Sequence, residues 1–192
     1  MNFKLIFGIL ATVLGIISFW PYLKDILHKK TKPHVYSWLV WTIIQTVGVL
    51  AMIKGGASFG ALGLAVGTLF CITIFLLAFK YGTRNITKLD TFLLISALII
   101  IVFWLIQKDP LISVILVTII DTIAFMPTYR KTYLAPYTET LSAYYLLASA
   151  NLLSIFAIAD YSLTTTLYIS TLVVTDTIMI FLLIFRRNVI LR

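Results

Sequence analysis

Charged residues are scarce in this chain of 192 residues, and cysteine occurs only once. Only 11% of the residues are charged, 61% are hydrophobic, and the mean hydropathy is +1.05. Soluble domains carry about a quarter charged residues, so this composition excludes an ordinary soluble domain. Because Cys71 lies alone in an apolar segment, a disulfide framework and a multi-cysteine metal site are excluded. The sequence therefore predicts an integral membrane protein.

Signatures of catalysis are also absent. The chain has no HExxH zinc motif and no GxSxG nucleophile elbow. An aspartyl dyad of Asp121 and Asp176 is disfavoured, because their flanking residues do not resemble those of intramembrane aspartyl proteases. We expect no enzyme, no cofactor and no bound metal. The net charge of +8 bears on orientation and on anionic membrane lipid rather than on nucleic acid, which we do not expect as a partner.

Long apolar segments are what the chain has in abundance. A membrane-spanning helix needs about 20 mostly apolar residues. Seven segments meet this requirement, with short loops between them: 4–23, 36–54, 58–80, 89–107, 110–130, 140–159 and 163–186. Tyr161 and Tyr168, near the ends of such segments, are expected to be interfacial anchors. The predicted fold is an all-α membrane protein with seven transmembrane helices.

The chain repeats itself with a constant offset. Phe19 and Pro21 return as Phe125 and Pro127, and the segment FLLAFK at 75–80 returns as FLLIFR at 181–186. Both matches are 106 residues apart (127 against 21, 181 against 75). A register held over such a distance indicates two copies of one structural unit. We predict two three-helix repeats, 1–86 and 109–192, joined by a linker helix in 87–108. An odd linker makes the repeats of this 3+1+3 arrangement parallel.

Basic residues test this layout, because they concentrate on the cytoplasmic side of membrane proteins. Twelve fall on one predicted side: Lys24, Lys29, Lys30, Lys32, Lys80, Arg84, Lys88, Arg130, Lys131, Arg186, Arg187 and Arg192. The other side has three: Lys4, Lys54 and Lys108. This asymmetry predicts an N-terminus outside and a C-terminus in the cytoplasm.

Prolines recur at the same place in both repeats. Pro21 and Pro127 lie near the cytoplasmic end of the first helix of each repeat. A proline inside a helix removes a backbone hydrogen bond and permits a kink, so both are candidate hinges of a gate. Prolines also often mark helix ends, which is the structural alternative.

Short motifs around these prolines resemble the PQ-loop, SWEET and SemiSWEET superfamily. The first copy is Phe19-Trp20-Pro21, then Lys29-Lys30-Thr31, then an apolar helix with Trp38 and Trp41; the second copy is Pro127-Thr128-Tyr129-Arg130-Lys131. The resemblance implies a SWEET-like seven-helix transporter, similar to bacterial members, in the bacterial cytoplasmic membrane. The chain departs from the family pattern at Tyr22 and Thr128, which stand where the name-giving glutamine would follow each proline. The third helix also lacks the usual sugar-site asparagine.

Four strongly polar residues fall near the midpoints of predicted helices: Gln45, Asp121, Asn151 and Asp176. A charged side chain there costs at least about 2.5–3.5 kcal/mol, so it usually faces a cavity or a partner. Both aspartates belong to the second repeat. They are expected to be protonated and hydrogen-bonded, to bind a coupling proton or sodium ion, or to meet a cationic substrate. Interhelical hydrogen bonding alone is the structural alternative.

These residues suggest roles in transport. Asp121 and Asp176 are predicted to couple an ion, and Gln45 and Asn151 to bind the substrate. Trp38 and Trp41, spaced i and i+3 on one helix face, are predicted to form an aromatic platform, with an interfacial position as the alternative.

We expect alternating-access transport of a small polar solute, such as a sugar, a vitamin precursor or an amino acid derivative. A non-transporting receptor or lipid-interaction protein with the same fold is the alternative, because fold does not decide function. Since the chain holds both repeats, a monomer can form the pore, and a homo-oligomer stays open.

Overall fold

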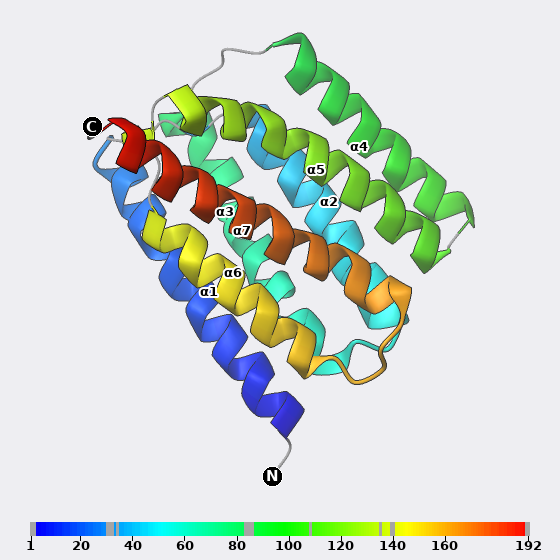
Figure 1. Ribbon diagram of the computed structural model, residues 1–192. Coiled ribbons are helices and arrows are strands. Elements are labelled where there is room, and N and C mark those ends of the chain that lie inside the picture. The colour runs from blue at the N-terminus through cyan, green and yellow to red at the C-terminus, as the bar shows by residue number, and fades with distance from the viewer. Residues whose placement is uncertain are drawn as a thin grey trace.

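The computed structural model describes residues 3–29, 33, 35–82, 87–107, 109–134, 136–138 and 141–190. These residues form a bundle of α-helices with two short 3₁₀ helices (Figure 1). The elements are α1 (Phe3–Leu27), α2 (Val35–Lys54), η1 (Ser58–Ala61), α3 (Leu62–Tyr81), α4 (Lys88–Gln107), α5 (Pro110–Leu134), η2 (Pro136–Thr138), α6 (Leu141–Ala157) and α7 (Leu163–Ile190). The all-helical part of the predicted fold is confirmed.

Within the described part of the chain, four helical stretches are long and apolar enough to cross a membrane. They are Phe3–Lys24, Val35–Lys54, Ser58–Tyr81 and Leu163–Ile190, while the apolar stretches of α4, α5 and α6 are shorter. The outer surface carries large apolar side chains, such as Trp20, Leu69 and Ile106, which are 67%, 62% and 71% exposed. Lipid accommodates such a surface, whereas water does not. Both features indicate an integral membrane protein.

The helix bounds follow the apolar segments closely, with differences at the ends. α1 continues past Pro21 to Leu27, α5 continues to Leu134, and α7 continues to Ile190. The predicted helices ended earlier than the observed ones, because the apolar segments of the sequence end where the Lys and Arg residues begin. A helix can extend beyond the hydrocarbon core with such residues at the headgroups. The third predicted helix begins with the 3₁₀ turn η1 rather than with α-helix.

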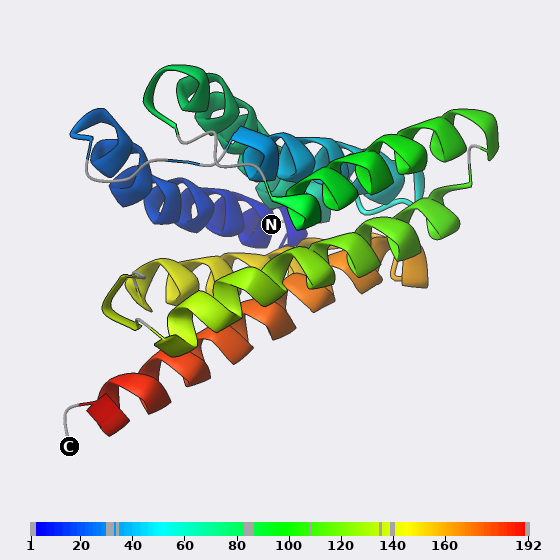
Figure 2. The ribbon, with the colours of Figure 1, turned by 90° about the horizontal axis from the view of Figure 1, so that it is seen from above.

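The helices pack in the same pattern in each half of the chain. α3 packs against both α1 and α2, and α7 packs against both α5 and α6. Between the halves, α1 packs on α6 and α2 packs on α5, which are equivalent pairs if the halves are repeats. α4 lies at the edge of the bundle against α2 and α5 (Figure 2). The first residues of equivalent helices are separated by nearly the same offset as the sequence repeat: α5 begins 107 residues after α1 (110 against 3), and α6 begins 106 after α2 (141 against 35).

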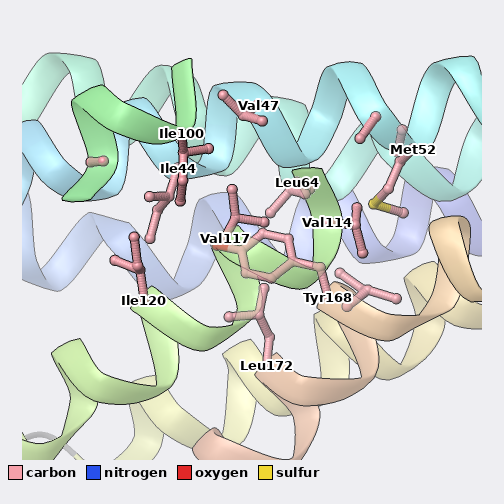
Figure 3. Packing of buried hydrophobic residues seen from close by; sticks show 14 of the residues in the cluster. Ile44, Val47, Met52, Leu64, Ile100, Val114, Val117, Ile120, Tyr168 and Leu172 are labelled. Atoms are coloured by element: carbon pink, nitrogen blue, oxygen red, sulfur yellow. The ribbon is translucent and has the colours of Figure 1, made fainter. Parts of the chain in front are cut away.

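The main hydrophobic core lies where α2, α4, α5 and α7 meet. The Tyr168 ring of α7 lies among Leu64, Val117 and Leu172 and is fully buried (Figure 3). Gly48 of α2 permits this packing, because a Cβ at that position would come within 2.8 Å of the Tyr168 ring. The buried position corrects the expectation that Tyr168 is an interfacial anchor. Tyr161, by contrast, is 58% exposed.

Two backbone hydrogen bonds tie the halves together where α2 ends and α7 begins. The amide of Ala159 donates to the carbonyl of Ala57, and the amide of Asp160 donates to the carbonyl of Gly56, both at 3.1 Å. Gly56 has a φ of +90°, a conformation that glycine adopts without strain. The Lys4 ammonium donates to the Ala159 carbonyl at 2.8 Å. We call this pairing of residues 55–61 with 158–160 the loop clasp, its end of the bundle the clasp end, and the opposite end the basic end.

Candidate functional site

Two of the predicted midplane residues are hydrogen-bonded to each other. The Asn151 Nδ2 on α6 donates to the Asp176 Oδ2 on α7 at 3.0 Å. Asp176 is only 4% exposed, so this donor replaces part of the water that the carboxyl loses on burial. Asn151 was predicted to bind substrate, but this N–H group is committed to Asp176.

Asp121 on α5 is the more deeply buried carboxyl, at 1% exposure. Its Oδ2 atom has no hydrogen-bond partner among the residues that the structure describes. Asp176 lies near enough for the two carboxyls to interact electrostatically. Every Lys and Arg that the structure describes lies within about two turns of a helix end, so among these residues neither carboxyl has a cationic neighbour at its own level of the bundle.

Gln45 and Cys71 continue the polar region toward the first half. The buried Gln45 Oε1 has no partner among the described residues, and it lies over Gly67, 3.5 Å from where a Cβ would stand. The Cys71 thiol lies beside the Gln45 amide and close enough to Asp121 for an electrostatic interaction. α2, α3 and α5 therefore bring polar groups to one interior region.

The Tyr168 hydroxyl completes this group. It is fully buried, it lacks a hydrogen-bond partner in the described part of the chain, and it interacts electrostatically with Asp121, Cys71 and Asp176. We call the six residues the interior cluster: Gln45, Cys71, Asp121, Asn151, Tyr168 and Asp176. Sequence reasoning missed Tyr168, although its spacing from Asp176, i and i+8 on one helix, places both on the same face.

Gln45 and Asn151 lie at one level of the bundle. α3 and α6 cross closely, since a Cβ on Gly63 would come within 2.6 Å of the Ser154 Oγ. The two helices run in opposite directions across the bundle. One turn from this crossing, Gly67 on α3 and Asn151 on α6 are therefore opposite each other. Because Gln45 lies over Gly67, the two amides share a layer, as their equivalent repeat positions suggest.

Comparisons with protein-family models, with curated proteins and with solved structures found no match.

Within the described residues, no group of three or more His, Cys, Asp or Glu side chains is placed to hold a metal ion.

The two tryptophans have different surroundings. Trp38 is 7% exposed and packs between the Tyr22 ring, at 5.3 Å, and the Trp41 ring, at 5.2 Å and an interplanar angle of 79°. It therefore belongs to the packing between α1, α2 and α3, together with Ile26 and Ile74. The ring of Trp38 is therefore covered by its neighbours and does not lie in a lipid-facing belt, and its predicted role in an aromatic platform for a solute stays a prediction.

Trp41 lines a pocket between α2, α4 and α5. The pocket has a volume of about 80 Å³ and is lined by Tyr36, Ser37, Val40, Trp41, Leu93, Ala124 and Thr128. Trp41 precedes Gln45 by one helical turn, and Ala124 follows Asp121 by one turn. The pocket therefore lies next to the interior cluster on the side of the basic end. Metabolite sites occupy about 300–1,000 Å³, so in this conformation the pocket is too small for a whole metabolite.

The two prolines belong to α1 and α5, the first helix of each half. Pro21 is exposed on the surface of α1, and the helix is continuous through it. Position 127 lies inside α5, but its side chain is outside the described residues. Pro21 does not belong to the interior cluster, and the role of both prolines as hinges stays a prediction.

Proposed function

We propose that this protein is a membrane transporter that moves a small polar solute by alternating access. The observation that carries the proposal is the interior cluster, where Asp121 is 1% exposed and its Oδ2 atom has no hydrogen-bond partner among the described residues. Buried polar groups in a membrane cost free energy, so a chain that keeps them usually uses them for a function. The cluster joins side chains from both halves of the chain, which is where a transporter built from repeats places its site.

The hydrogen bonds at the two ends of the bundle support alternating access. At the clasp end, the bonds of the loop clasp join the first half to the second. At the basic end, three side chains donate to carbonyls of the second half: Tyr129 to Thr175, Arg186 to Tyr133 and Arg187 to Pro136. The pocket also lies on the side of the basic end. This conformation has the clasp end closed, and a second conformation would open the loop clasp.

The packing pattern supports the proposed 3+1+3 arrangement of seven spans with α4 as the linker. The distribution of basic residues supports an N-terminus outside and a C-terminus in the cytoplasm. The clasp end then faces outward. The motif resemblance supports a place in the PQ-loop and SWEET superfamily and a bacterial cytoplasmic membrane, with membrane lipid as the surrounding partner.

Roles follow from the contacts. Asp121 is proposed to couple an ion or to meet the solute directly. Asp176, held by Asn151, contributes negative charge to the same region. Gln45 offers a carbonyl oxygen to the solute, and Trp41 contacts it in the pocket. Pro21 and Pro127 keep the proposed role of hinges for the gate.

The test is binding followed by flux. The purified protein is screened in detergent for shifts in melting temperature with sugars, nucleosides, vitamin precursors and amino acids at two pH values. A solute that binds only the folded protein raises the melting temperature. Solutes that do so are then tested for uptake into proteoliposomes, with empty liposomes as the control. Uptake that saturates with solute concentration is the expected result.

Two outcomes would contradict transport. If solutes raise the melting temperature but none crosses the membrane, the protein is a receptor on this fold. If only anionic lipids change the melting temperature, it is a lipid-interaction protein.

A further inference from the structure

We propose that the transported solute carries a positive charge, as an amine, a quaternary ammonium or a guanidinium group, and that Asp121 is its counter-charge. This inference rests on the proposed transport function and adds the chemical class of the solute. Three observations carry it: the charge of the interior, the kind of atoms that lack partners, and the lining of the adjacent pocket.

Among the described residues, the interior has acidic groups but no basic ones. Asp121 and Asp176 are 1% and 4% exposed and lie near each other, while the described lysines and arginines lie near the helix ends. A buried charge is costly unless it is paired. Asn151 donates a hydrogen bond to Asp176 but brings no charge. A cationic solute would supply the missing positive charge at the moment of transport.

The atoms without partners are mainly hydrogen-bond acceptors. Those of the interior cluster are the Asp121 Oδ2, the Gln45 Oε1 and the hydroxyl of Tyr168, which both donates and accepts; the fourth such atom in the described residues, the Thr132 Oγ1, lies outside the cluster. A ligand that satisfies two acceptors must donate hydrogen bonds or carry charge. Ammonium and guanidinium groups donate several N–H bonds and accept none. A carboxylate or phosphate would leave these oxygens unsatisfied and would add repulsion.

The pocket beside the interior cluster has the lining that suits a cation. Two aromatic residues, Tyr36 and Trp41, line it together with the hydroxyl-bearing Ser37 and Thr128, and none of its lining residues is charged. Cations bind to the faces of tryptophan and tyrosine rings, more strongly where water is excluded. The pocket lies one helical turn from Asp121 and Gln45, so a cation would pass from aromatic contact to the carboxyl.

The experiment uses solute pairs that match in shape and differ in charge. The pairs are choline with 3,3-dimethyl-1-butanol, butylguanidine with butylurea, and putrescine with 1,4-butanediol. Each is tested with the full-length protein for a melting-temperature shift and for uptake into proteoliposomes. We expect at least one cationic member to bind and to be taken up about tenfold or more faster than its neutral partner, because the neutral one leaves the buried carboxyl unpaired.

Two variants assign the effect to Asp121. Asp121→Asn keeps the shape and removes the charge, and we expect it to abolish the preference for the cationic member. Asp109→Asn is the matched control, at the residue that precedes the same helix. Asp109 is exposed, and its Oδ1 accepts the amide of Leu111 at 2.8 Å, a cap that asparagine also provides. This control is expected to keep the preference.

Each outcome separates the two proposals. If the neutral members are taken up faster, with or without a proton gradient, the proposal of a cationic solute is rejected and the proposal of transport stands. Binding of a cationic member without uptake keeps the charge preference and contradicts transport. If no member of any pair binds or enters, the cationic solute is rejected, and the wider solute screen then decides on transport.

Discussion

At the scale of single residues, the hydrogen bond from Asn151 to Asp176 connects α6 to α7 in the interior of the bundle. Asn151→Leu removes the donor and leaves a buried carboxyl with one partner fewer. We expect a loss of about 1–3 kcal/mol in the free energy of unfolding, measured by denaturant titration in detergent micelles. The exposed position Ser142 on the same helix provides the control Ser142→Leu, which is expected to change stability little.

The double variant Asn151→Leu with Asp176→Leu tests the reason for this loss. Replacing both partners removes the unsatisfied carboxyl, so the double variant is expected to be more stable than Asn151→Leu alone. Equal stability of Asn151→Leu and Ser142→Leu would show that the hydrogen bond has no energetic role.

Gly48 provides a second test at this scale. A Cβ at this position would come within 2.8 and 2.9 Å of two ring atoms of Tyr168, which is fully buried and has no room to move. Gly48→Ala is therefore expected to destabilise the protein by about 1–3 kcal/mol. Gly15→Ala is the matched control, because nothing lies within 4 Å of its added Cβ. The measurement is the melting temperature in detergent, and a greater loss for Gly15→Ala would contradict the packing.

At the scale of elements, the loop clasp depends on close contact between η1 and the end of α6. A Cβ on Gly60 would come within 2.5 Å of the Ile158 Cγ1 and within 2.9 Å of its Cα. Gly60→Ala is therefore expected to push the paired segments apart. Ala57 is fully buried in the clasp. The variant Ala57→Cys, made in a Cys71→Ala background, therefore measures how accessible the clasp is. We expect a polar maleimide to label this cysteine slowly with Gly60 in place and several-fold faster in the Gly60→Ala variant.

The control for the labelling is Leu163→Cys, at a position that is 55% exposed and lies beyond the clasp. Its labelling rate is expected to be the same with either residue at position 60. An unchanged rate at Ala57→Cys would show that the clasp does not close this end of the bundle.

The elements themselves were largely predictable from the sequence, because a bilayer demands long apolar runs and such runs are visible without a structure. The partners of each helix were not. Nothing in the hydropathy of α1 shows that it packs on α6 rather than on α2, since all faces of these helices are apolar. The close approaches depend on small residues, such as Gly48 beside Tyr168, and these are readable only once the helices are placed.

At the scale of the whole molecule, the interior cluster was predictable in part. The cost of polar groups in a membrane singled out Gln45, Asp121, Asn151 and Asp176 in the sequence. Their pairing was not predictable, because it depends on how the helices pack, as the hydrogen bond between Asn151 of α6 and Asp176 of α7 shows. Trp38 looked available for a solute in the sequence, but its ring is packed between its neighbours in the structure. Conversely, the position of Tyr168 near a helix end concealed that its hydroxyl lies inside the protein.

Orientation in the membrane is the last property of the whole molecule and has a direct test. Twelve of the fifteen basic residues belong to the basic end or its loops, and such residues resist transfer across the membrane during insertion. We therefore expect the clasp end outside and the basic end in the cytoplasm. In a Cys71→Ala background, an impermeant maleimide should label Leu163→Cys in intact cells. It should label Asn188→Cys, an exposed position near the end of α7, only after the cells are permeabilised. The reverse pattern would invert the proposed topology, and labelling of both in intact cells would mean a mixed population of orientations.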